Sequence, residues 1–280
     1  MKTLVTGGTG RVGRRFVPRL LDHGTDVRVL ARDAGRAEPL RARGAEVVLG
    51  DLRDADAVAR AVAGVDAVVH LAAAFRSVPD EEAVAVNCDA AAALAAAAGR
   101  AGARRFVLAS TNLVYGPGRG RPAVEDDPPA PAGAYPESKA AAEAAVGDLG
   151  RDGELDVRVV RLAFVYGEGD PHLAEALRWA RGWPAHKGLH LVHHADAGQG
   201  LLRALHADGI GGATFNVADD APVTAYEVLR LNGEAVAGDA AERPLDDPWE
   251  GIVDTARIRR DLGFRPIHPT VYAARAAGAL

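Results

Sequence analysis

Short apolar runs alternate with longer helical segments over the first 161 residues. The apolar runs predict strands at Thr3–Thr6, Asp26–Leu30, Glu46–Leu49, Ala67–His70, Phe106–Ser110 and Val157–Arg161. The segments between them predict helices at Arg11–His23, Asp54–Ala63, Glu81–Arg100 and Ala134–Leu149. Apolar strands that alternate with helices are typical of a parallel sheet covered on both faces. The pattern therefore predicts an α/β fold with a doubly wound parallel sheet, the Rossmann arrangement.

Beyond Arg161 the regular alternation stops and the predicted elements become shorter. They are a helix near Leu173–Arg181, a strand near Thr214–Val217, a helix opened by Thr224, and a helix at Thr255–Leu262 that ends at Gly263. We interpret residues 1–165 as the main domain and residues 166–280 as a smaller, partly interleaved substrate-binding region. It is expected to lie over the carboxyl ends of the strands, where open α/β sheets bind ligands.

Charge and composition exclude several classes of function. The 280-residue chain has a formal net charge of −5, and its Arg residues are scattered, so nucleic-acid binding is not expected. No apolar run approaches the roughly 20 residues of a membrane span, and the N-terminus lacks the pattern of a signal peptide. We therefore expect a cytoplasmic protein that does not bind membranes.

A glycine-rich turn follows the first predicted strand. The segment "TGGTGRVG" places Gly7, Gly10 and Gly13 between a strand and a helix. Glycines in that order allow a tight turn and let backbone N–H groups approach a pyrophosphate at the helix N-terminus. The turn predicts dinucleotide binding, with Arg11 and Val12 among the contacts.

The end of the second strand bears on the choice of cofactor. An Asp or Glu there would bind the ribose 2′-hydroxyl of NAD, but this chain has Ala31 and then Arg32. A guanidinium suits the 2′-phosphate of NADP, and Arg11 is a candidate to assist it. The alternative is that Arg32 is a solvated charge and Asp33 binds the ribose of NAD. We predict NADP, with NAD left open.

The ends of the third and fourth strands supply the other predicted cofactor contacts. Asp51 follows the third strand, where a carboxylate can meet the adenine amino group. Small residues after His70 permit close approach of the cofactor, whereas His70 itself is expected to be packed at the strand end. The contacts predicted here are Asp51, Leu52, Leu71, Ala72 and Ala73.

A Tyr and a Lys lie four residues apart at the start of a predicted helix. This spacing puts Tyr135 and Lys139 on one helix face. A free Tyr titrates near pH ~10, and a neighbouring ammonium lowers that pKa by stabilising the phenolate. The pair is therefore a candidate acid/base unit at neutral pH. Alone, the Y-x-x-x-K spacing occurs by chance in many helices.

Together, these motifs resemble the extended short-chain dehydrogenase/reductase family, in its NAD(P)-dependent epimerase/dehydratase branch. The resemblance covers nearly the whole chain, through "TGGTGRVG", "GDLRD", "HLAA", "STNLVYG", "YPESK", "RLAFVYGEGD" and "DTARIRRDLGF". It implies that Tyr135 is the general acid/base and that Lys139 binds the nicotinamide ribose and lowers the Tyr135 pKa. It further implies that Thr111 holds the substrate oxygen and that Val165 lies near the nicotinamide.

The resemblance also implies a homodimer, because such enzymes commonly dimerise through two long helices. The Ala-rich stretch Ala83–Ala98 is a candidate for that interface. A helix that simply packs on the sheet explains the same composition. Asn87, within this stretch, matches an Asn of the family's long helix and is expected to be structural or to position water.

Departures from the family pattern narrow the reaction. Sugar-nucleotide dehydratases carry T-D-E at the end of the fifth strand, whereas this chain has Asn112 and Leu113 after Thr111. Neither side chain can remove a proton from carbon, so dehydration is disfavoured. Phe164 stands where many sugar-nucleotide enzymes have an Asn that touches the diphosphate, which favours a substrate without a nucleotide.

The spacing of the histidines matches no zinc site with a carboxylate base, so substrate contact or loop surface is expected at His186, His190, His193 and His194, and no metal. Trp179 and Trp183 are expected to pack, and Trp183 is a candidate for the substrate pocket. We predict an NAD(P)-dependent oxidoreductase that reduces the carbonyl of a small molecule with NADPH. The alternatives are a sugar epimerase that retains its cofactor and a non-catalytic dinucleotide-binding redox sensor.

Overall fold

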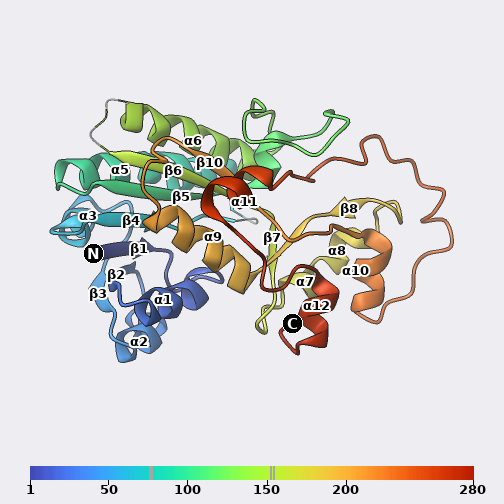
Figure 1. Ribbon diagram of the computed structural model, residues 1–280, viewed down its shortest axis with the longest axis horizontal. Helices are drawn as coiled ribbons and strands as arrows, with labels where there is room; N and C mark the ends of the chain where they lie inside the picture. The colour runs from blue at the N-terminus through green and yellow to red at the C-terminus, as the bar shows by residue number, and fades with distance from the viewer. Residues whose placement is uncertain (76–77, 152, 154) are drawn as a thin grey trace.

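A parallel sheet forms the centre of the computed structural model, which describes residues 1–75, 78–151, 153 and 155–280. Within these residues the sheet has seven strands in the order β10-β6-β5-β4-β1-β2-β3 (Figure 1). The strands are β1 (Lys2–Thr6), β2 (Asp26–Ala31), β3 (Glu46–Leu49), β4 (Ala67–His70), β5 (Arg105–Thr111), β6 (Asp156–Leu162) and β10 (Thr214–Val217). Every pairing is parallel. The doubly wound fold is confirmed, and each predicted strand is correct to within one residue at either end.

Helices cover both faces of this sheet, as continuous apolar strands require. One face carries α1 (Gly13–Asp22), α2 (Ala34–Ala42), α9 (His194–His206) and α11 (Ala256–Leu262), which share one hydrophobic core with it. The other face carries α3 (Ala55–Val62), α5 (Ala90–Arg100) and α6 (Ala134–Arg151), which share a second core. Figure 1 shows α1 and α9 in front of the sheet and α5 and α6 behind it.

Two of these helices were not expected from the sequence. Pro39 lies inside α2, and the apolar period of α2 is weak because only Ala37 and Leu40 are buried. The start of α9 carries three polar side chains, and its histidines were interpreted as loop surface or substrate contacts. Yet Ala197, Leu201, Ala204 and Leu205 fall on one face and enter the core, so α9 is an ordinary amphipathic helix.

The predicted helix Glu81–Arg100 is interrupted by one π-helical segment. The chain forms α4 (Asp80–Val84), the π segment η1 (Ala85–Asp89) and then α5. From the sequence we expect no apolar run near membrane length. Contrary to this, the 21-residue stretch Asp80–Arg100, with a mean hydropathy of 1.2, is long and apolar enough to cross a membrane, by length and composition only. The alanines raise the hydropathy despite the acidic first turn. In the fold, α5 packs against α3 and α6, as the core helix of a domain does.

The C-terminal part forms a smaller layer beside the carboxyl ends of the strands. Here β7 (Phe164–Tyr166) pairs with β9 (Leu191–His193), and β8 (Gly188–Leu189) pairs with β11 (Val223–Thr224). Four helices pack on them around a third core: α7 (His172–Glu175), α8 (Leu177–Ala180), α10 (Ala225–Leu231) and α12 (Val271–Ala276). The predicted helix Leu173–Arg181 is thus two short ones. A capping box at Thr224 and Glu227 starts α10 where expected.

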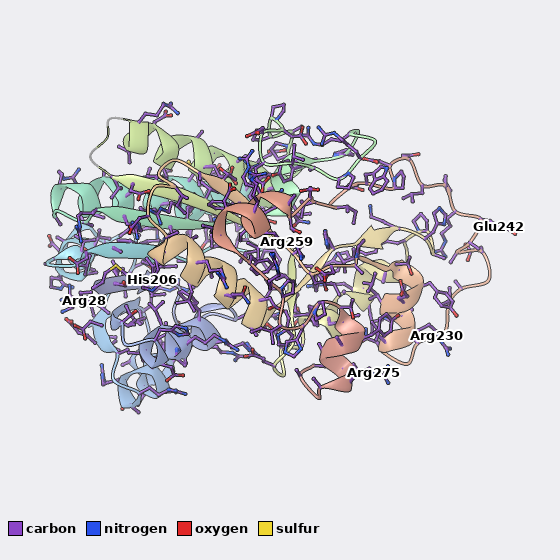
Figure 2. The ribbon with its side chains drawn as sticks, in the orientation of Figure 1. Arg28, His206, Arg230, Glu242, Arg259 and Arg275 are labelled. Atoms are coloured by element: carbon purple, nitrogen blue, oxygen red, sulfur yellow. The ribbon has the colours of Figure 1, made fainter. Side chains whose placement is uncertain are left out.

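The chain crosses between the two layers several times after β6. It enters the smaller layer with β7, returns to the sheet with α9 and β10, and leaves again with β11 and α10. The connection from α10 to α11 then runs along the outside of the smaller layer, where Figure 2 labels Glu242, and ends beside the sheet. The division of the chain at residue 165 stays a prediction.

Candidate functional site

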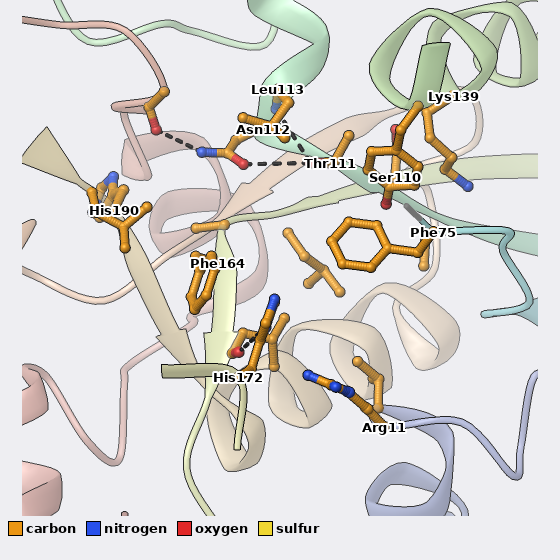
Figure 3. A pocket seen from close by; sticks show the side chains of 18 of the residues that line it. Arg11, Phe75, Ser110, Thr111, Asn112, Leu113, Lys139, Phe164, His172 and His190 are labelled. Atoms are coloured by element: carbon orange, nitrogen blue, oxygen red, sulfur yellow. Dashed lines mark hydrogen bonds between the residues drawn. The ribbon is translucent and has the colours of Figure 1, made fainter. Parts of the chain in front are cut away.

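A cavity of about 420 Å³ opens at the carboxyl ends of the strands. Its polar side comes from the ends of β1, β4 and β5 and from the start of α6. Its other side comes from the smaller layer and from residues 250–251 (Figure 3). Of the predicted site residues, the cavity brings together Arg11, Val12, Leu71, Ala73, Thr111, Tyr135, Lys139 and Val165.

The glycine turn packs so tightly that side chains have no room there. Gly7 has a φ of +71°, and a Cβ on it would lie 2.5 Å from the backbone N of Ala72. A Cβ on Gly13 would lie 2.2 Å from the Gly7 carbonyl oxygen. The Gly10 N–H donates to that same oxygen over 2.9 Å. The turn and the N-terminus of α1 therefore have the shape and the N–H donors that a pyrophosphate needs.

The side chains after the end of β2 are an exposed Arg32 and an Asp33 that caps the next helix. Arg32 is 76% exposed, and its guanidinium lies 3.9 Å from Asp51. The Asp33 carboxylate accepts the Arg36 N–H over 3.0 Å and caps α2, so it is already engaged. The Arg36 guanidinium, which the sequence analysis missed, donates to the Thr9 carbonyl of the glycine turn over 3.1 Å. The guanidinium groups of Arg32 and Arg36 thus both follow the end of β2.

Arg11 ties the glycine turn to the smaller layer. It forms two hydrogen bonds with Glu175, of 2.6 and 3.0 Å, and lies 3.3 Å from Asp170. Asp170 also accepts from His194 over 2.8 Å, and its pKa falls to about 2 because its hydrogen bonds and nearby cations outweigh the effect of burial. Arg11 therefore faces Asp170 and Glu175, and not the side of the turn where Arg36 and Arg32 lie.

Thr111, Tyr135 and Lys139 line the same wall of the cavity. The Thr111 hydroxyl accepts the Leu113 N–H over 3.3 Å and caps the short 3-10 helix η2 (Asn112–Tyr115). The Tyr135 ring meets Phe75 edge to face, with centroids 4.8 Å apart. Lys139 is 2% exposed, and burial lowers its pKa to about 8. Tyr135 and Lys139 lie four residues apart on α6 (Ala134–Arg151), a spacing that puts them on one helix face, where an ammonium favours the phenolate.

Buried partners fix the positions of Tyr135 and Lys139. One turn after Lys139, Glu143 is bound by Arg161, with the closest contact at 2.6 Å, so the charge of Glu143 is largely matched by another cation. Asn87, on the π segment, donates to Ser138 over 3.0 Å and exchanges two hydrogen bonds with the backbone of Ala74. It therefore braces the start of α6 against the segment after β4, a structural role consistent with the expectation for this residue.

Asn112 connects the polar wall to a strap over the cavity, which we define as residues 250–254. Its amide nitrogen donates to the Gly251 carbonyl over 2.6 Å, and its amide oxygen lies 3.5 Å from the Thr111 hydroxyl (Figure 3). The strap is also held by His190, whose Nδ1 accepts the Val253 N–H over 3.2 Å. At the position after Thr111 this chain therefore has a residue that binds the strap to the end of β5.

Aromatic rings form the opposite wall. Phe164 stacks on His172 with centroids 3.8 Å apart, and His172 is oriented by a 2.9 Å hydrogen bond between Nδ1 and the Val165 carbonyl. Trp179 and Trp183 line the wall next to Lys187, which is paired with Glu250. The expectation that Trp183 reaches the pocket agrees with this placement.

Three of the histidines singled out above, His190, His193 and His194, are hydrogen-bonded to separate partners. His190 lies between the Asp219 carbonyl and the Val253 N–H, His193 contacts the Ala279 carbonyl over 2.8 Å, and His194 binds Asp170. Burial lowers the pKa of His190 to about 4, so His190 is neutral, and burial also lowers the pKa of His194. In the part of the chain that the structure describes, no group of three or more His, Cys, Asp or Glu could hold a metal ion.

The predicted residues outside the cavity lie at the cofactor end. Gly7, Gly10 and Gly13 form the turn itself, Ala72 packs against Gly7, and Arg32 and Asp51 lie beside one another. Leu52 packs on the second core. His70 is buried, binds Thr6 over 2.7 Å and has its pKa lowered to about 3, which fits a packed strand-end histidine. The cavity residues that were missed include Phe75, Asp170 and His172; of these, Asp170 ends the quoted segment "RLAFVYGEGD" but was given no role.

The family follows from comparison with known proteins. The model of the NAD dependent epimerase/dehydratase family matches residues 3–182. A ketoreductase from Stigmatella aurantiaca that acts on a farnesylated 3-oxo-dihydroquinoline oxide is 31% identical, over 92% of this chain and 83% of its own length. The dTDP-glucose 4,6-dehydratase of Streptomyces griseus is 33% identical, over 94% of this chain and 88% of its own length. The crystal structure of Thermus thermophilus UDP-glucose 4-epimerase with NAD has a TM-score of 0.77 and 28% identity, covering 95% of this chain and 94% of that one.

The protein belongs to the NAD dependent epimerase/dehydratase family. It is therefore an NAD(P)-dependent enzyme of the extended short-chain dehydrogenase/reductase type, as predicted. Its relatives act by reduction, dehydration or epimerisation, so membership alone leaves the reaction to be argued from the site.

Proposed function

We propose that the enzyme uses NADPH to reduce the carbonyl group of a small molecule. The observation that carries this proposal is the meeting of Thr111, Tyr135 and Lys139 on one wall of the cavity, beside an Asn112 that is bound to the strap. The cofactor supplies a hydride to the carbonyl carbon. The protein's part is to hold the carbonyl oxygen and to provide its proton.

Each side chain of the wall has a defined task. Thr111 donates a hydrogen bond to the carbonyl oxygen, and Tyr135 transfers its phenolic proton to that oxygen as the C=O bond becomes C–OH. Lys139 stabilises the phenolate that remains on Tyr135, and a proton from solvent restores the phenol. The product is an alcohol, and atoms and charge balance over the cycle.

The acids in the cavity support reduction over dehydration. Among the described residues that line it, the carboxylates are Asp170, bound to His194 and Arg11, and Glu250, bound to Lys187. Loss of water needs an acid and a base at the substrate carbons, and Asn112 and Leu113 supply neither. The preference for NADPH rests on Arg32 and on the engagement of Asp33 in capping α2.

The second candidate is an epimerase that retains its cofactor. The same Tyr and Lys would serve it, and the likeness to a UDP-glucose 4-epimerase bound to NAD favours it. Homodimerisation through the Ala83–Ala98 stretch and a cytoplasmic location stay predictions. A redox sensor without catalysis would not need this wall.

The test is to purify the protein and release any bound dinucleotide by denaturation. NADPH consumption is then followed at its absorbance band with a panel of ketones and aldehydes. Turnover that consumes NADPH supports reduction. Tightly bound NAD, together with interconversion of a sugar nucleotide and no net consumption of NADPH, would establish the epimerase instead.

A further inference from the structure

The wall that faces Thr111 and Tyr135 is built of flat apolar groups. Phe164, Trp179, Trp183 and Leu189 line it. Phe75 lies between this wall and Tyr135, with its ring centroid 5.9 Å from that of His172 and 4.8 Å from that of Tyr135. Figure 3 shows Phe75, Phe164 and His172 around the space below Thr111. Because Phe164 is stacked on a hydrogen-bonded His172, its ring is held in place. Rings arranged in this way bind another ring by stacking or edge contact.

The cations of the cavity already have partners or tasks. Arg11 is bound to Glu175 and Asp170, and Lys187 is paired with Glu250. Lys139 is 2% exposed, His190 is neutral because burial lowers its pKa to about 4, and His194 is bound to Asp170. Among the described residues of the lining, this leaves no cation to receive a second diphosphate besides that of the cofactor. Phosphate charge brought into an apolar cavity without a counter-charge is strongly disfavoured.

The size of the cavity points the same way. A volume of about 420 Å³ lies in the lower part of the ~300–1,000 Å³ that small-molecule sites span, and Lys139 and Val165, the predicted nicotinamide contacts, line it too. A nucleoside diphosphate sugar would have to place its base and both phosphates along the aromatic wall. A compact ring system fills the same wall with matching apolar surface.

We infer that the substrate is an uncharged, planar aromatic ketone or aldehyde, and not a sugar nucleotide. This inference rests on the proposed reduction at Tyr135, since it places the carbonyl oxygen at Thr111 and Tyr135 and the ring among Phe75, Phe164 and Trp183. Phe164 and Trp183 are then the residues that select the ring.

The direct test compares two probes on the enzyme saturated with NADP⁺. Calorimetric titration with 2-acetylnaphthalene and with UDP-glucose measures both affinities without turnover of the ketone. The inference predicts that 2-acetylnaphthalene binds at least about tenfold more tightly than UDP-glucose. A factor of about ten in affinity is what the loss of one well-placed aromatic contact in a binding site typically costs. UDP-glucose binding as tightly, or more tightly, would overturn it.

Two variants identify the wall that makes the difference. Trp183→Ala and Phe164→Asn are each expected to weaken 2-acetylnaphthalene about tenfold, while Phe164→Asn leaves UDP-glucose unweakened because it adds an amide donor. Trp249→Ala is the matched control, since Trp249 is half exposed and lies outside the lining. NADPH affinity should stay unchanged in all three, which shows that they fold. If Trp183→Ala and Phe164→Asn both bind the ketone like the parent, the inference is wrong.

Turnover separates this inference from the proposed function. If 2-acetylnaphthalene binds tightly but consumes no NADPH, the proposed reduction of this class fails and the binding preference stands. If NADPH is consumed more efficiently with a 4-keto sugar nucleotide than with 2-acetylnaphthalene, reduction stands and the substrate class is overturned.

Discussion

The two walls of the cavity are built in different ways. The polar wall comes from the carboxyl ends of neighbouring strands and the start of α6. Behind it, Arg161 is bound to Glu143 and Asn87 to Ser138. The aromatic wall is assembled from segments around residues 164, 172, 183, 190 and 251. The bond from Asn112 to Gly251 connects it to the sheet, and the bond between His190 and Val253 joins two of its own segments.

We interpret this contrast as a division of roles, in which the polar wall carries out the reaction and the aromatic wall selects the substrate. A wall with buried, redundant contacts keeps its geometry whatever substrate arrives, which a proton-transfer site requires. A wall of stacked rings and single hydrogen bonds can vary without disturbing that geometry. Relatives with the same fold reduce, dehydrate and epimerise different molecules, in keeping with this division.

The strongest test of the polar wall is Tyr135→Phe. Removing the phenolic proton should lower kcat by about 10²–10⁴-fold, because general acid catalysis contributes that much. The affinity for NADPH should stay nearly unchanged, since the ring remains. Steady-state kinetics and calorimetry measure both quantities, and Tyr226→Phe on the exposed face of α10 serves as the control. A variant that keeps most of its activity would contradict the assigned mechanism.

The cofactor end is tested by Arg32→Ala. A guanidinium bound to a phosphate contributes about 1.5–3 kcal/mol, so NADPH should bind roughly tenfold to a hundredfold more weakly. NADH should be affected little, because it lacks the 2′-phosphate. Arg41→Ala is the control, because Arg41 is an exposed arginine on the nearby helix α2. It should change neither affinity. Equal losses for both cofactors would refute the preference for NADPH.

The support of the aromatic wall depends on pH through Asp219. This residue is 1% exposed, and burial raises its pKa to about 8; its backbone carbonyl accepts from His190. The folded state therefore keeps a proton that the unfolded chain loses above its ordinary pKa. The stabilisation by this group is complete below pH ~4 and is lost as pH rises toward about 8.

Asp219→Asn removes that titration. We expect the variant to gain up to about 4 kcal/mol of unfolding free energy relative to the parent at pH 8 compared with pH 5, at about 1.4 kcal/mol per pH unit. Urea unfolding followed by Trp fluorescence at the two pH values measures this difference. The exposed Asp26→Asn should show no such change. A gain that is the same at both pH values would rule out Asp219 as the titrating group.

The smallest expected effect is that of the link between the two walls. Asn112→Ala removes the hydrogen bond to the Gly251 carbonyl, which is worth about 0.5–1.5 kcal/mol. KM should rise about twofold to tenfold while kcat and NADPH affinity stay close to those of the parent. Asn232→Ala, which removes another amide-to-carbonyl bond, should leave KM unchanged. A loss confined to kcat would instead place Asn112 in the chemical step.

Much of the fold could be predicted from local patterns. Strands of a parallel sheet are buried on both faces, so their apolar runs stand out, and all seven predicted strands are correct to within one residue at either end. Helix α9 was missed because its polar first turn hides the buried face that follows. The short strands β7, β8, β9 and β11 have two or three residues each and carry no periodic signal.

The sequence by itself determined the glycine turn, the Tyr135 and Lys139 pair and the departures at Asn112 and Phe164, because each depends on neighbours along the chain. The contacts of Arg11 with Glu175 and Asp170, and of Asn112 with the strap, are visible only in the folded chain. These contacts join residues more than a hundred positions apart. Their partners are chosen by the packing of the smaller layer on the sheet, which no local spacing encodes.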